Sequence, residues 1–141
     1  YTANPIGCAA ALANLDLFDR ENTLANVNER APQLRDGMRK LADLPHVGDF
    51  RHIGFMAALE LVRDQETKDP YPSGHELMTT IYREGLKRNV MLRPLGNMVY
   101  LFPPLCTTEE ELTDILARTS DTLHHVLGSA SGLSKTPIWD V

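Results

Sequence analysis

Residues 47–62, VGDFRHIGFMAALELV, predict two β-strands joined at Gly54. The segment before this glycine is mixed in polarity, whereas the segment after it is apolar on both faces except at Glu60. A continuous apolar run of this length is typical of a strand that is covered on both sides. We therefore expect a hairpin at the centre of the fold, with both faces of its second strand covered.

Helical patterns lie on both sides of this hairpin. Asn4 and Pro5 are a typical cap and first position, so they predict a helix that ends near Arg20. Thr23 is expected to cap a second helix, which carries an apolar stripe and ends before Pro45. Pro32 favours a break or kink within it. The stripe consists of Val27, Leu34, Met38 and Leu41.

Two more helices and two more strands are expected after the hairpin. Residues 74–88 predict a helix that Asn89 ends in the left-handed conformation. Residues 90–95 and 98–102 predict strands, and the two prolines that follow remove backbone donors. The last helix starts at Thr107 or Thr108, with Glu110 or Glu111 completing a capping box. Together these elements predict an α+β fold with helices packed on a small, mostly antiparallel sheet.

Composition indicates one soluble globular domain. The chain has 141 residues, of which 43% are hydrophobic and 23% charged, with a formal net charge of −5. This charge offers no basic surface for nucleic acid, and no apolar run approaches the roughly 20 residues of a membrane helix. Cys8 and Cys106 are not spaced as a metal or redox pair, so we interpret them as buried free thiols in a reducing cytosol. The five histidines are not arranged as metal ligands, and no metal site is expected.

Arg93 is a permanent cation inside the apolar run of residues 91–96, MLRPLG. Burying an unpaired guanidinium is costly, so an anion is expected beside it. That anion is either a structural carboxylate or a substrate. From the residue alone, the structural ion pair is the commoner arrangement.

Several segments together resemble the class III, pyridoxal-phosphate-dependent aminotransferases. Residues 93–105, RPLGNMVYLFPPL, resemble the C-terminal signature of this family, and residues 1–11, YTANPIGCAAA, resemble its entry into the small domain. Residues 47–51, 58–62 and 69–72 are similar to the biotin-pathway branch, which acts on 8-amino-7-oxononanoate. The resemblance runs from Tyr1 to about Leu127.

The resemblance implies a fold, a cofactor and a set of site residues. The fold is the small C-terminal domain of the aspartate-aminotransferase-like architecture, and the cofactor is pyridoxal 5′-phosphate (PLP). Arg93 matches the arginine that binds the substrate carboxylate. Tyr100 matches a tyrosine near the substrate, although a tyrosine packed in the sheet explains it equally well. Tyr1 and Thr2 would lie beside the cofactor phosphate, across a homodimer interface in a cytoplasmic enzyme.

The resemblance also implies that the chain is part of a larger enzyme. The family's Schiff-base lysine lies upstream of the matched region, and Lys40, Lys68, Lys87 and Lys135 have no suitable setting for that role. Residues 1–127 are therefore expected to be the small domain and residues 128–141 a flexible tail, and the chain alone is expected to be inactive. The amino donor, S-adenosylmethionine or lysine, stays open.

Two other functions stay open at this point. One is the small domain of another class III aminotransferase, acting on ω-amino acids or ornithine-like substrates. The other is a non-catalytic interaction domain.

Overall fold

A hairpin of two antiparallel strands forms one side of the sheet, as residues 47–62 predict. Strand β1, Val47–Ile53, pairs with β2, Met56–Leu61, and β2 pairs on its other edge with β3, Met98–Leu101. The sheet is therefore antiparallel with the order β1-β2-β3. This computed structural model describes residues 2–72 and 76–128.

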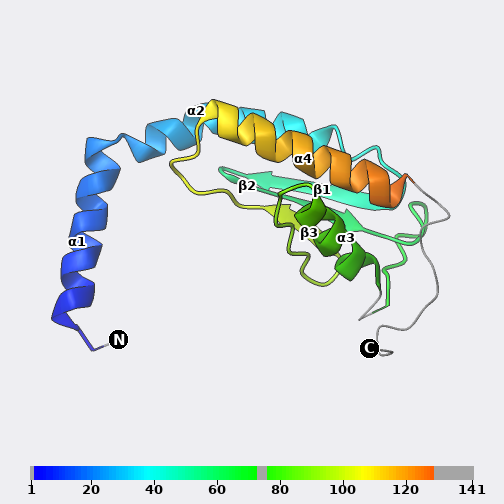
Figure 1. Cartoon of the computed structure of the whole chain (residues 1–141), viewed down its shortest axis with the longest axis horizontal. Helices are drawn as coiled ribbons and strands as arrows, with labels where there is room; N and C mark the ends of the chain where they lie inside the picture. Colours follow the sequence, from blue (N-terminus) through cyan, green and yellow to red (C-terminus); the bar gives the residue numbers. More distant parts are fainter. Residues whose placement is uncertain (1, 73–75, 129–141) are drawn as a thin grey trace.

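Four helices complete the α+β fold. Helices α2, Thr23–Arg39, and α4, Glu109–Leu127, lie side by side over one face of the sheet (Figure 1). Helix α3, Glu76–Lys87, packs against α4. The side chains between these layers are fully or almost fully buried, and they include Leu34, Met38, Leu59, Leu61, Leu77, Ile81, Leu112 and Leu123.

The other face of β2 is more open than its sequence predicts. Ala57, Leu59 and Leu61 point into the core, whereas Met56 on the opposite face is 43% exposed and Glu60 is half-buried. The prediction that both faces of this strand are covered is therefore wrong. The period of two in side-chain direction separates the faces, and only the face toward α2 and α4 belongs to the core.

Helix α1, Pro5–Arg20, projects away from the rest of the molecule (Figure 1). Asn4 caps it as predicted, because its side-chain oxygen accepts a hydrogen bond from the Ile6 amide at 2.9 Å. None of the helix residues is buried, and α1 contacts α2 but none of the other named elements.

The boundaries of α2 differ from the sequence prediction. Thr23 is the first helical residue, and Asn22 occupies the cap position with a left-handed φ of 49° and no side-chain cap. The helix continues through Pro32, whose ring is exposed to solvent, and ends at Arg39. The apolar stripe is confirmed, since Leu34 and Met38 have no exposed surface.

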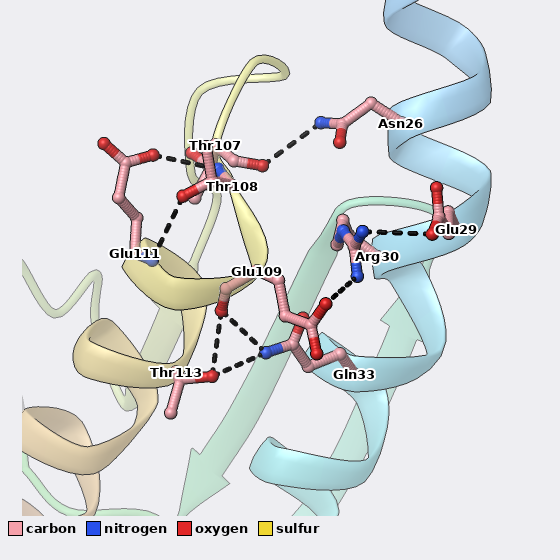
Figure 2. Close-up of polar contacts among 9 residues, drawn as sticks. All are labelled: Asn26, Glu29, Arg30, Gln33, Thr107, Thr108, Glu109, Glu111 and Thr113. Carbon is pink, nitrogen blue, oxygen red and sulfur yellow. Dashed lines mark hydrogen bonds and ion pairs between the residues drawn. The ribbon is translucent and has the colours of Figure 1, made fainter.

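The N-terminus of α4 resolves the choice between two capping pairs. The Thr108 hydroxyl accepts from the Glu111 amide at 3.3 Å, and the Glu111 carboxylate accepts from the Thr108 amide at 2.8 Å (Figure 2). This reciprocal pair satisfies two donors at the helix start. The adjoining turn is held to α2, because Asn26 donates to the Thr107 carbonyl (Figure 2) and to the Leu105 carbonyl.

Residues 90–95 do not form the predicted strand. They make only one isolated bridge, between Leu95 and Met98, whose amides donate to each other's carbonyls at 2.9 and 3.0 Å. Pro94 removes a backbone donor, and Gly96 turns the chain with φ of 56°, so the run cannot continue as a ladder.

One smaller expectation is corrected, and one loop side chain is buried. Cys8 and Cys106 are free thiols, but both are exposed rather than buried. Tyr71, in the loop after β2, is only 5% exposed and its hydroxyl lies 2.9 Å from His46 Nδ1. It therefore packs on its own domain. Ile138 and Trp139 of the predicted tail lie outside the described residues.

Among the helices of the described ranges, none combines the length and apolar character needed to cross a bilayer.

Candidate functional site

Arg93 and Tyr100, the two residues predicted to bind substrate, line the same surface hollow. Its volume is about 360 Å³, and its wall combines residues from the segment after α3, from β3 and from α4. The lining residues are Asn89, Val90, Met91, Arg93, Tyr100, Leu101, Phe102, Pro103 and Ile115. The wall is mostly apolar, with one permanent cation.

Arg93 is exposed and makes no hydrogen bond or ion pair with any residue in the part of the chain that the structure describes. The structural carboxylate considered from the sequence is therefore absent from residues 2–72 and 76–128. An exposed guanidinium remains hydrated, so it can stay unpaired until an anion reaches it. Its planar fork can bind a carboxylate through two parallel hydrogen bonds.

The end of α3 directs the backbone that carries Arg93. Asn89 has the left-handed φ of 57° that the sequence predicts, its amide donates to the Leu86 carbonyl at 3.1 Å, and the Val90 amide donates to the Gly85 carbonyl at 3.0 Å. These two bonds form a Schellman motif, which turns the chain back along the helix. Leu92 then enters the core with no exposed surface, so the neighbouring Arg93 is left at the surface.

Gly85 allows this close return. A Cβ atom at this position would lie 2.8 Å from the Val90 carbonyl oxygen and 3.5 Å from Leu92 Cγ. The first distance is too short for a carbon atom against a backbone oxygen. The path of the Arg93 segment along α3 therefore requires glycine here.

Tyr100 lies on β3, on the open face of the sheet. It pairs with Ala58 of β2, which pairs in turn with Arg51 of β1, so the three residues form one row across the sheet. Tyr100 is half-buried, which agrees with a position that is partly in the sheet and partly in the hollow.

The same face carries a charged group that sequence reasoning did not interpret as part of a site. Arg51 forms ion pairs with Glu60 at 2.5 Å and with Asp49 at 3.6 Å, and its Nη2 lies 3.6 Å from the Met98 sulfur. The side chains of Arg51 and its two partners are all at least 42% exposed. The signal in the sequence was Glu60, the one charge in an otherwise apolar strand. Because Arg51 is already paired, Arg93 is the cation more available to a ligand.

A second ion-pair group stabilises the end of α3. The Glu84 side chain is only 15% exposed and accepts from Lys87 at 2.6 Å and from Arg88 at 2.7 Å, while His125 Nε2 of α4 lies 3.5 Å away. Hydrogen bonds from Lys87 and then Arg88 lower the pKa of Glu84 from 4.5 to about 2.

The two predicted cofactor-binding residues are placed differently. Tyr1 lies outside the described residues. Thr2 is exposed, with φ of 50°, and it precedes α1, whose N-terminal end lies away from the sheet (Figure 1). The structure therefore does not bring Thr2 together with Arg93 and Tyr100 within this chain.

The described lysines do not fit the attachment of PLP. Lys68 donates to the Gly48 carbonyl at 2.8 Å, Lys87 pairs with Glu84, and Lys40 is exposed just after α2. None of them lines the hollow of Arg93. Lys135 lies outside the described residues. The residues of the hollow can therefore form one wall of a ligand site. The described lysines do not provide an attachment point for the cofactor there.

Sequence reasoning missed most of the wall of the hollow. Ile115 of α4 packs against the core and also lines the hollow. Phe102 is 61% exposed and Met91 is 70% exposed beside the same hollow. Exposed apolar side chains next to a single cation indicate a binding site. Exposure cannot be read from a sequence, so this indication was not available.

Comparison with known proteins places these features in a family context. The sequence model of the family Aminotransferase class-III matches residues 1–123. Two similar curated proteins are both named adenosylmethionine-8-amino-7-oxononanoate aminotransferase. The one from Methanocaldococcus jannaschii is 43% identical over 112 residues, which are 79% of this chain and 24% of the relative. The one from Geobacter sulfurreducens is 40% identical over 128 residues, which are 91% of this chain and 28% of the relative.

Solved structures agree with the sequence comparison. An aminotransferase from Vibrio fluvialis, in its PMP-bound form, superposes with a TM-score of 0.82 and 32% sequence identity, covering 89% of this chain and 28% of that one. The chain thus spans about a quarter of the length of the curated relatives and solved structures that it matches.

Proposed function

Because the chain belongs to the class III aminotransferase family, we propose that it forms the small domain of a PLP-dependent transaminase of biotin biosynthesis. In this proposal residues 1–127 are the small domain and residues 128–141 a tail. The enzyme converts 8-amino-7-oxononanoate to 7,8-diaminononanoate, in agreement with the names of the two relatives at 40% and 43% identity.

The observation that carries the proposal is an unpaired guanidinium beside an apolar wall. A substrate with a carboxylate at the end of an aliphatic chain has matching chemistry, because Arg93 can bind the carboxylate and Met91 and Phe102 can contact the chain. Tyr100 would lie beside this substrate. In this proposal Arg93 and Tyr100 are binding residues.

The cofactor would be held mainly by residues other than those described here. Bound PLP supplies the electron sink of transamination. Since the described lysines do not fit its attachment, no step of that chemistry is assigned to this chain. Tyr1 and Thr2 would contribute to the phosphate site across the interface of a homodimer, and the exposed apolar surface of α1 supports such an interface. A cytoplasmic location is proposed because the two described thiols are free.

A chimera tests this function directly. Residues 1–128 of this chain would replace the matched segment of the Geobacter sulfurreducens relative, and the purified chimera would be assayed with 8-amino-7-oxononanoate. We expect turnover, and Arg93→Ala should lower kcat/KM by roughly tenfold to a hundredfold, the value of about 1.5–3 kcal/mol for one charge-assisted pair.

Two further variants separate binding from general effects. Arg93→Lys should recover part of the loss, because an ammonium keeps the charge without the two-pronged geometry. Arg83→Ala, which removes an exposed arginine of α3 outside the hollow, is the matched control and should leave kcat/KM unchanged. An Arg93→Ala chimera with the parent's kcat/KM and a lower melting temperature would show that Arg93 is structural.

A further inference from the structure

The position of Arg93 depends on the backbone before it, because its own side chain has no partner among the described residues. That backbone leaves α3 at Arg88 and reaches Arg93 after five residues. Leu92 fixes one end of this segment in the core, and the Val90 amide fixes its middle on the Gly85 carbonyl. At the remaining end, the Arg88 amide donates to the Gly85 carbonyl at 2.9 Å and its guanidinium pairs with Glu84, so only the Arg88 carbonyl still needs a contact.

Helix α4 provides that contact through Arg118. Its Nη1 donates to the Arg88 carbonyl oxygen at 2.8 Å, while its Nε donates to the Asp114 carboxylate at 2.6 Å. The Arg88 carbonyl follows the last turn of α3, so the helix itself offers it no donor. Asp114 lies one turn before Arg118 on the same helix and holds the guanidinium in the orientation that reaches α3.

The same helix also supplies part of the wall of the hollow. Ile115 lies three residues before Arg118, on neighbouring turns of α4, and it lines the hollow together with Arg93. Helix α4 therefore contacts the Arg93 segment at its start through Arg118 and contributes to the surface that the ligand would touch through Ile115. Movement of the segment relative to α4 would change the distance between the cation and the apolar wall.

We propose that Arg118 is a positioning residue for Arg93. This inference rests on the proposed function, in which Arg93 binds a carboxylate at the end of an aliphatic chain. Arg118 holds residues 88–93 against α4 before the ligand arrives. The distance between the Arg93 guanidinium and the apolar wall is therefore already set for a ligand that contacts both. A binding group that is held in place in advance loses less conformational freedom on binding, and its affinity rises accordingly.

The test measures carboxylate binding to the full 141-residue chain. The probe is octanoate, which combines one carboxylate with an aliphatic chain, and binding is followed by NMR through the Arg93 Nε–H and Tyr100 amide resonances. Arg118→Met keeps the aliphatic length but removes every donor, and it should weaken octanoate binding roughly fivefold to tenfold. Arg118→Lys keeps a donor and should restore part of the affinity.

Two readouts distinguish positioning from a contribution to stability alone. The resonances report only folded molecules, so a loss of stability by itself leaves the dissociation constant unchanged. Amide hydrogen exchange of Val90 should also become faster in Arg118→Met, because the start of the segment loses its link to α4. Arg35→Met is the matched control, since it removes an exposed arginine that is paired with a neighbouring aspartate on α2, and it should change neither quantity.

Each result has one meaning. Weaker binding in Arg118→Met, with partial recovery in Arg118→Lys and no effect of Arg35→Met, supports the inference. Unchanged octanoate affinity in Arg118→Met and Arg118→Lys overturns it and leaves the proposed function intact. Octanoate binding to the unaltered chain that survives Arg93→Ala overturns the proposed carboxylate site, and the inference with it. If Arg118→Met does not fold, the affinity of Arg118→Lys decides between the first two results.

Discussion

Replacing Gly85 by alanine should destabilise the chain, although the same change stabilises most helices. An alanine in a helix interior is favoured over glycine by about 0.8–1 kcal/mol. At Gly85 the new Cβ would lie 2.8 Å from the Val90 carbonyl oxygen. Because this oxygen belongs to the backbone, the segment after α3 must move to make room. Overpacking of this kind costs about 1–3 kcal/mol, so after the gain in helix propensity is subtracted the free energy of unfolding should fall by up to about 2 kcal/mol.

Gly37→Ala is a suitable control, because Gly37 lies within α2 and its Cβ would also meet an obstacle. That obstacle is Leu116 Cδ1 at 2.5 Å, the tip of a half-buried side chain that can rotate away. The gain in helix propensity and the cost of moving this leucine should nearly cancel, leaving a change of about 0.5 kcal/mol or less.

Urea unfolding of the two variants measures the difference. With a slope of about 2 kcal/mol per molar urea, Gly85→Ala should lower the midpoint by up to roughly 1 M, and Gly37→Ala should leave it nearly unchanged. The transition should be followed by near-ultraviolet circular dichroism of the tyrosines, which reports side-chain packing. If Gly85→Ala raised the midpoint as much as helix propensity alone predicts, the close return of residues 88–93 along α3 would be wrong.

Three further predictions concern the cap of the last helix, the loss of stability at acidic pH and the exposed first helix. Thr108→Ala should cost about 1 kcal/mol in urea unfolding, because it removes one half of the capping box. A Thr108→Ser variant that did not recover most of this loss would argue against the cap. Glu84 has a pKa of about 2 in the fold and 4.5 without its partners, so its stabilising effect is full above pH 4.5 and is lost as the pH falls toward 2. Glu84→Gln should flatten the pH dependence of the melting temperature in this window, and a slope equal to that of the unaltered chain would contradict the ion-pair assignment. Ile6, Leu12 and Leu15 of α1 are 80%, 65% and 60% exposed, so the chain should associate at moderate concentration. Sedimentation should show less association after Leu12→Gln with Leu15→Gln, and a monomer at high concentration before any change would contradict this.

Local signals predicted most of the secondary structure. Asn4, Thr108 and Asn89 act where the sequence places them, because capping and left-handed termination depend on one residue and its immediate neighbours. The hairpin also lies where residues 47–62 predict it, because its glycine and the apolar run that follows it are local features. Asn22 is the exception among the caps. It takes the left-handed conformation that joins α1 to α2. The preference of a residue for the cap position does not predict the direction in which two helices are joined.

The errors arose where distant parts of the chain decide the structure. Residues 90–95 have the composition of a strand, but Leu92 is drawn into the core beside Gly85, and no strand partner is available. Glu60 was the visible sign that one face of β2 is open, yet the apolar residues around it dominated the pattern. Arg93 and Tyr100 were predicted one by one from a family resemblance. Their meeting in one hollow, with Ile115 of α4 as part of the wall, depends on tertiary packing that the local pattern does not contain.

The isolation of α1 has a consequence for how the chain unfolds. A helix of 16 residues that buries none of its side chains has little stability of its own. Nucleation is costly, and isolated helices shorter than about 12–15 residues are only marginally stable in water. In a dilute monomer α1 should therefore fray and reform in well under a millisecond, independently of the sheet and its three packed helices. Far-ultraviolet circular dichroism would then show a gradual loss of helix before the cooperative transition of the packed residues. Two spectroscopic probes would give different midpoints for the same molecule, and a single unfolding free energy would describe only the part of the chain that contains the core.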